Sequence, residues 1–72
     1  MTHQERLNDL NARVEKLESK EVKHIDIAKL MVSNVTKFMN TQCPDENFKN
    51  ETIVMSLDNA EDFITRLEAK NP

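Results

Sequence analysis

Glycine is absent from this chain of 72 residues, and so are tryptophan and tyrosine. Glycine adopts positive φ at little cost, so its absence disfavours hairpin-rich β folds and the glycine loops that cradle phosphate. Proline occurs twice and first appears at Pro44, so the preceding residues contain neither strong helix breaker. We therefore expect an all-α protein.

Cysteine and long apolar runs are also scarce. The single cysteine excludes an internal disulfide, and two histidines add few metal ligands, so we expect no cofactor or metal. No run reaches the roughly 18 apolar residues of a membrane span, and the beginning of the sequence, MTHQERLNDL, lacks a signal-peptide core. An unpaired thiol is typical of a reducing compartment, so we expect a cytoplasmic protein without membrane contacts.

The charges are divided unevenly. Residues 1–40 carry 7 basic and 6 acidic side chains, whereas residues 41–72 carry 3 basic and 7 acidic ones. The acidic part would repel phosphate, so no nucleic-acid binding is expected, although it would attract a basic protein surface. Cys43 has no histidine near it in the sequence, and neighbouring acids such as Glu61 and Asp62 diverge on a helix. We expect no enzymatic activity.

The N-terminal part predicts one long helix. Thr2 and Glu5 have the spacing of a capping box, and no breaker follows before Pro44. A helix from about residue 3 to about residue 41 would be roughly 58 Å long at about 1.5 Å per residue. We therefore expect residues 1–42 to form a coiled-coil helix, because few compact domains of this size could hold such a rod.

The first half of this helix has a thin apolar line, consisting of Leu7, Leu10, Val14 and Leu17, spaced 3, 4 and 3 residues apart. On a helix these residues fall within about 80°, which is the narrow stripe of a coiled coil. The second half has a wider apolar face that must be packed on two sides. Leu17 and Ile25 are separated by 8 residues, which favours a stutter; an unbroken heptad would instead place Glu21 and His24 in the core.

Arg13 and Glu18 indicate how copies of the helix would pair. They occupy g and e positions beside the line, which face each other between parallel chains. The run from Arg13 to Glu18 is similar to the short motif of parallel trimeric coiled coils, so we favour a trimer, with a dimer as the alternative. The predicted homo-oligomer interface contains Leu7, Leu10, Arg13, Val14, Leu17, Glu18, Ile25, Ala28, Val32 and Val35.

The C-terminal part predicts a shorter helix that folds back. Residues 43–51 are expected to be a polar connector, and residues 52–72 a helical segment, with residues 51–55 open to either strand or helix. Its large apolar residues need a covered place, and the wide face of residues 25–39 offers one. The residues expected to pack there are Phe48, Ile53, Phe63, Ile64 and Leu67.

This layout, together with the run from Asn50 to Met55 and the apolar residues from Ala60 to Leu67, resembles the small tail-fibre assembly chaperones of T-even-type bacteriophages. The resemblance implies an oligomer that helps trimeric fibre chains fold in the host cytoplasm. We therefore expect a non-enzymatic coiled-coil assembly factor or scaffold that acts on a client protein. The alternative hypothesis is a small inhibitor that docks its acidic end on a basic site of an enzyme such as a nuclease.

Overall fold

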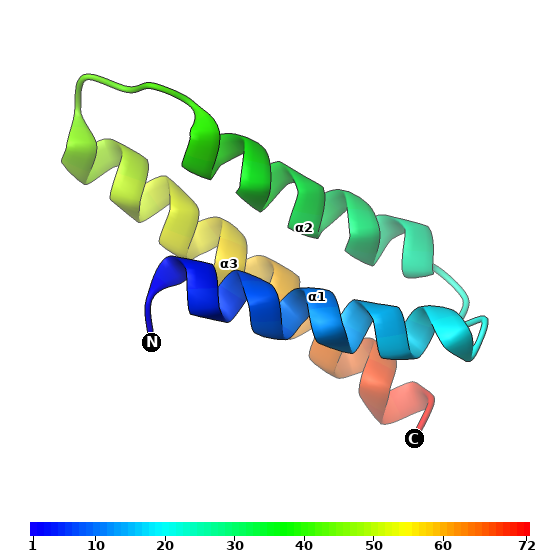
Figure 1. Cartoon of the computed structure of the whole chain (residues 1–72). Coiled ribbons are helices and arrows are strands. Elements are labelled where there is room, and N and C mark those ends of the chain that lie inside the picture. Colours follow the sequence, from blue (N-terminus) through cyan, green and yellow to red (C-terminus); the bar gives the residue numbers. More distant parts are fainter.

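Three helices follow one another in an up-down-up arrangement in the computed structural model, which describes all 72 residues (Figure 1). They are α1 (His3–Ser19), α2 (Ile25–Asn40) and α3 (Glu46–Lys70). Each helix contacts the other two, and α1 and α3 run parallel to each other. The all-α prediction is confirmed, and no helix is both long and apolar enough to cross a bilayer.

The start of α1 has the predicted capping box. The Thr2 hydroxyl accepts a hydrogen bond from the Glu5 N–H at 3.1 Å, and the Thr2 N–H donates to the Glu5 carboxylate at 3.0 Å. This backbone hydrogen bond, with a further one from the Thr2 hydroxyl, lowers the pKa of Glu5. Two of the free groups at the helix start thereby gain partners within the chain.

The turn between α1 and α2 contradicts the prediction of one helix over residues 3–41. Glu21 and His24 adopt the left-handed conformation, with φ of 55° and 68°. This conformation costs a residue other than glycine roughly 1–2 kcal/mol. Val22, between them, is buried and compensates part of that cost, since burying a valine contributes about 1.5–3 kcal/mol. Packing of the two helices against each other therefore outweighs the local preference for a continuous helix.

The third helix is longer than predicted and begins earlier. Asp45 caps it by accepting a hydrogen bond from the Phe48 N–H at 3.0 Å, so residues 46–51, which were expected to lie in a polar connector, are helical. Residues 51–55 are helical as well, and α3 spans 25 residues. The polar composition after Pro44 concealed this start, although glutamate and lysine are good helix formers.

One core cluster of 13 buried residues joins the helices. The apolar line of α1 lies in it, covered by α2 and α3 of the same chain and not by another copy as predicted. No polar residue is buried. The core members are Leu7, Leu10, Val14, Leu17, Val22, Ala28, Val32, Val35, Ile53, Leu57, Ala60, Ile64 and Leu67.

The expected C-terminal packing residues separate into two groups. Ile53, Ile64 and Leu67 are buried, and Phe63 is partly buried against the core. Phe48 is 62% exposed, so the prediction that it packs inside is wrong. It lies in the first turn of α3, beyond the part of that helix whose apolar residues face the core.

Leu57 provides a test of this arrangement because it is fully buried in the middle of α3. Leu57→Ala is expected to lower the free energy of unfolding by about 2–5 kcal/mol, through lost burial and an unfilled cavity. Leu30→Ala is the matched control, because Leu30 is 59% exposed, and should change stability by less than about 0.5 kcal/mol. Urea unfolding followed by circular dichroism measures both. Equal effects of the two substitutions would contradict the packing described here.

Candidate functional site

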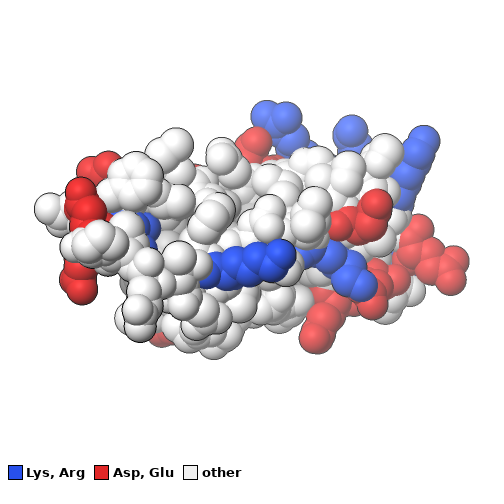
Figure 2. All heavy atoms as spheres, turned by 90° about the horizontal axis from the view of Figure 1, so that it is seen from above, with Lys and Arg blue, Asp and Glu red and all other residues white.

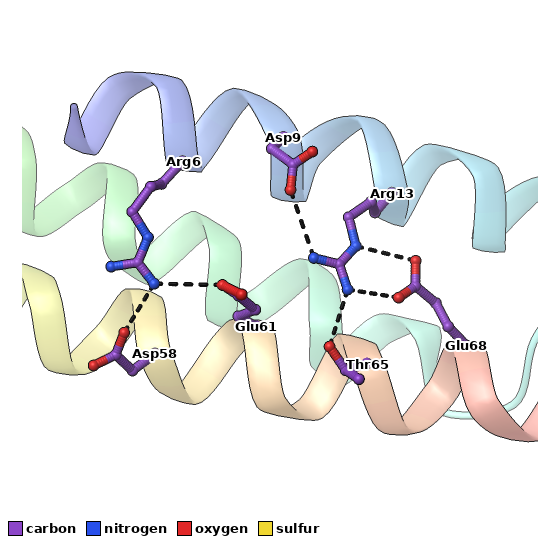
Figure 3. Close-up of polar contacts among 7 residues, drawn as sticks. All are labelled: Arg6, Asp9, Arg13, Asp58, Glu61, Thr65 and Glu68. Carbon is purple, nitrogen blue, oxygen red and sulfur yellow. Dashed lines mark hydrogen bonds and ion pairs between the residues drawn. The ribbon is translucent and has the colours of Figure 1, made fainter. Parts of the chain in front are cut away.

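Arg13 joins α1 to α3 within one chain (Figure 3). Its guanidinium donates two hydrogen bonds to the Glu68 carboxylate, one of them from Nε at 3.0 Å, and a third to the Thr65 hydroxyl at 3.0 Å. It also pairs with Asp9 at 3.5 Å. Hydrogen bonds from Arg13 lower the pKa of Glu68, and the positive charge of Arg13 lowers it further. The predicted partner, Glu18 of a neighbouring chain, is replaced by Glu68 of the same chain.

A second set of polar contacts lies nearer the start of α1. The Arg6 guanidinium donates to Asp58 at 2.8 Å and to Glu61 at 3.4 Å (Figure 3). The His3 ring shares a hydrogen bond with the Asn50 side chain at 2.6 Å. Because α1 residues contact α3 residues 47, 52 and 55 positions later, these contacts fix one register between the two parallel helices.

Glu18 takes part in the contact between α1 and α2. Its carboxylate pairs with the Lys29 ammonium group at 2.8 Å, close to the turn that connects these helices. The contact raises the pKa of Lys29 through this hydrogen bond and through charge attraction. Every ion pair between two helices therefore involves α1, and none joins α2 to α3.

The exposed large apolar side chains of the folded helices belong to α2 and α3. Five large apolar side chains of these helices are exposed; we call them the apolar face: Ile27, Leu30, Phe38, Phe48 and Met55. On α2 they follow one side of the helix, where Met31 is partly buried between them. On α3, Phe48 and Met55 are separated by two turns, and both are more than 60% exposed.

A pocket of about 150 Å³ lies within this face, where α2 ends and α3 begins. Phe38 and Phe48 line it from the two helices, and Cys43 lines it from the connection between them. The Cys43 thiol donates to the Asp45 carbonyl oxygen at 3.4 Å. Seen from the α2 side, acidic side chains lie toward the two ends of the molecule and a basic side chain lies across its middle, with uncharged atoms over much of the rest (Figure 2).

No cluster of metal-binding side chains competes with the apolar face as a candidate site. The structure contains no group of three or more histidine, cysteine or acidic side chains that could hold a metal ion. His24 lies exposed at the α1–α2 turn and makes no side-chain hydrogen bond to cap α2. The apolar face is therefore the candidate functional site.

The sequence contained part of the signal for this face. The apolar residues of positions 25–39 spread over more than half of the helix circumference, which required packing on two sides. In the structure α3 and α1 cover the side that bears Ala28, Val32 and Val35, and the other side stays open. The contribution of Phe48 was missed, because large aromatic residues are usually assigned to a core.

Compared with known protein families, characterised proteins and solved structures, the chain shows no significant match.

The contact between Arg13 and Glu68 predicts a pH-dependent stability. The folded state lowers the pKa of Glu68 below its ordinary value of 4.5. The carboxylate therefore stabilises the fold fully above about pH 4.5, and this stabilisation is lost as the pH falls through the lowered value. Glu68→Gln should cost about 1 kcal/mol at neutral pH, because the pair is partly exposed to solvent, and progressively less as the pH falls below about 4.5.

Urea unfolding of both proteins at neutral and acidic pH measures this difference. Asp62→Asn serves as the control, since Asp62 pairs with Arg66 inside α3 and does not touch α1. A loss that is the same for Glu68→Gln at both pH values would show that the ion pair is not its cause.

Proposed function

We propose that this protein is a non-enzymatic assembly factor or scaffold that binds a client protein chain through the apolar face of α2 and α3. The observation that carries the proposal is the concentration of exposed large apolar side chains on the one pair of helices that no ion pair joins. Exposed apolar side chains that lie together, as Phe38 and Phe48 do around the pocket, are typical of protein interaction sites. Phenylalanine and methionine are also enriched at such interfaces.

The shape of the face favours a helical segment as its ligand. Two antiparallel helices form a long shallow groove, and an amphipathic helix can place its apolar side chains in such a groove. The bound segment would become a fourth helix on the side of the bundle opposite α1. The pocket between Phe38 and Phe48 would accept one large apolar side chain of the client.

The size of the face favours weak and reversible binding. Complete burial of a large apolar side chain contributes about 1.5–3 kcal/mol, and these five are already partly covered. Association itself costs about 4–15 kcal/mol in lost freedom of movement. A single copy would therefore hold a client briefly and release it, as an assembly factor must do.

Self-association belongs to the same proposal. The apolar line of α1 led us to expect a parallel coiled-coil homo-oligomer, with a trimer favoured. In the folded chain α2 and α3 cover this line. An oligomer of chains folded in this way would have to use the apolar face instead. A tail-fibre-type client and action in the host cytoplasm remain part of the proposal, and their support is the resemblance of the C-terminal segment to that chaperone family.

The inhibitor hypothesis has weaker support from the geometry. It requires acidic side chains of the C-terminal part to be free for a basic partner. Asp58 and Glu61 contact Arg6, Glu68 contacts Arg13, and Asp62 contacts Arg66 of its own helix. All four acidic groups in residues 58–68 are therefore paired within the chain. The apolar face has no such internal partner.

The proposal is tested with the double substitution Phe48→Ser and Met55→Ser. Both side chains are mostly exposed, so the fold should be retained while client binding falls at least about tenfold. The measurement is affinity capture from the native host with quantitative mass spectrometry, alongside circular dichroism. Asn47→Ser with Glu51→Ser is the control, because these exposed residues lie on the same helix.

The control protein should capture the same client as the unchanged protein. If the client is captured equally by all three proteins, the apolar face is not its binding site. If nothing is enriched over an unrelated helical protein, the assembly-factor proposal itself is wrong.

A further inference from the structure

We propose that this chain also forms an exchanged dimer, in which α1 and α2 fuse into one continuous helix and α1 packs on α2 and α3 of a second copy. The inference is independent of the client proposal, because it uses the buried line of α1 and leaves the apolar face exposed. The turn at residues 20–24 connects the two helices.

This turn contains the only two residues with positive φ in the chain, Glu21 and His24. Neither is glycine, and glutamate has no particular tendency toward this conformation. His24 precedes α2 without a side-chain hydrogen bond that would cap the helix. Straightening the turn into helix would return both residues to a favourable conformation, and no glycine or proline in residues 20–24 opposes this.

The buried residues of the two helices fit a single straight helix. Five turns of 3.6 residues make 18 residues, after which a helix presents the same side again. The core positions of α1 recur in α2 at this interval, in the pairs Leu7 and Ile25, Leu10 and Ala28, Val14 and Val32, and Leu17 and Val35. Fusing the helices would therefore place both apolar lines on one side.

Residues at the junction would occupy consistent places in such a helix. Val22, which is buried in the closed turn, would lie within about 60° of Ile25 and so stay beside the apolar side. Glu21 would interrupt the apolar side once. It would lie at the boundary between the two bundles of the dimer, where solvent reaches, and outside either core.

All contacts that hold α1 in place can form equally well between chains. Arg6, Arg13 and Glu18 contact residues of α2 and α3 through side chains that lie outside the turn. In the exchanged dimer each α1 would make the same contacts with the second copy. Only the hydrogen bonds of the turn, such as those from the Lys20 and Ile25 N–H groups, would be replaced by helical ones.

The dimer would be elongated and symmetric. Both apolar lines lie on the same side of the fused helix, so the two three-helix bundles would follow one another along it. The two fused helices would run in opposite directions. The long dimension would be about twice the 41 Å of the closed chain.

The test uses complementation between two defective chains. Arg13→Glu places like charges opposite Glu68, and Glu68→Arg places like charges opposite Arg13, so each protein alone is destabilised whether closed or exchanged. When the two are unfolded and refolded together, exchange of α1 pairs Glu with Arg in both bundles. We expect a species of twice the 8.4 kDa chain mass that melts above either variant alone.

Light scattering and thermal unfolding of the mixture give the result. The chain that carries both substitutions is the control for the reversed pair and should behave like the unchanged protein. A mixture that keeps the mass of one chain and melts as its two components do would overturn the proposal.

The turn supplies a second test that does not depend on destabilised variants. The unchanged protein, refolded at about millimolar concentration, should contain the dimer. Glu21→Gly with His24→Gly relieves the closed turn and should lower the dimer fraction at least about tenfold. Lys20→Gly with Lys23→Gly is the control, since these residues have negative φ and glycine weakens the fused helix equally.

Equal loss of dimer with both glycine pairs, or no dimer in the unchanged protein, would contradict the inference. A dimer that disappears with Phe48→Ser and Met55→Ser but persists with glycine at positions 21 and 24 would instead be held by the apolar face. The two proposals therefore fail separately.

Discussion

The narrow apolar line of α1 is the constraint on which the rest of the structure depends. Four residues, spaced 3, 4 and 3 apart, cannot be hidden by the helix that carries them. In this chain α3 and α2 cover the line, and that single requirement explains the direction of α3, the turn after Ser19 and the positions of Arg6 and Arg13. The left-handed conformation of Glu21 is a consequence of bringing α2 back along α1.

Burial of the α1 line within the same chain also determines where charged and apolar side chains lie on the surface. The two arginines of α1 lie at the edge of its apolar line, and their guanidinium groups extend over it to acids of α3. Lys29 does the same between α2 and α1. Ion pairs lie beside the contacts that α1 makes with α2 and with α3. The contact between α2 and α3 has no ion pair, and these two helices carry the exposed apolar side chains. The candidate site follows from the place of α1 in the bundle.

The sequence predicted the helical class, the cap at Thr2 and the residues of α1 that need burial. It did not predict what would bury them, because a line of this width is covered equally well by another copy or by a distant part of the same chain. Arg13 shows the same ambiguity. Its position beside the apolar line predicts a contact with a carboxylate of an adjacent helix, and Glu68, 55 residues later in the same chain, provides that carboxylate. The turn at residues 20–24 carried no signal, since positive φ is normally announced by glycine or asparagine.

The start of α3 shows a different limit. Asp45 and the polar residues after it have the composition of a loop, yet an aspartate that accepts the Phe48 N–H makes them the first turns of the longest helix. Phe48 was assigned to the core on hydrophobicity alone. Phe48 precedes Ile53, the first core residue of α3, by five residues, which places it about 140° around the helix from that residue and beside the end of α2.

The apolar line of α1 can be covered by α2 and α3 of the same chain or of a second copy. The protein concentration decides which of the two forms is populated. A closed chain holds α1 against its own α3 at an effective concentration in the millimolar range, which is typical of short connections. A second copy competes only when its own concentration approaches that value, or when the turn is strained enough to shift the balance. Two left-handed residues without glycine provide such strain. Under the proposed function, copies of the protein would be crowded where client chains assemble, and these are the conditions under which α1 and α2 would join into one helix.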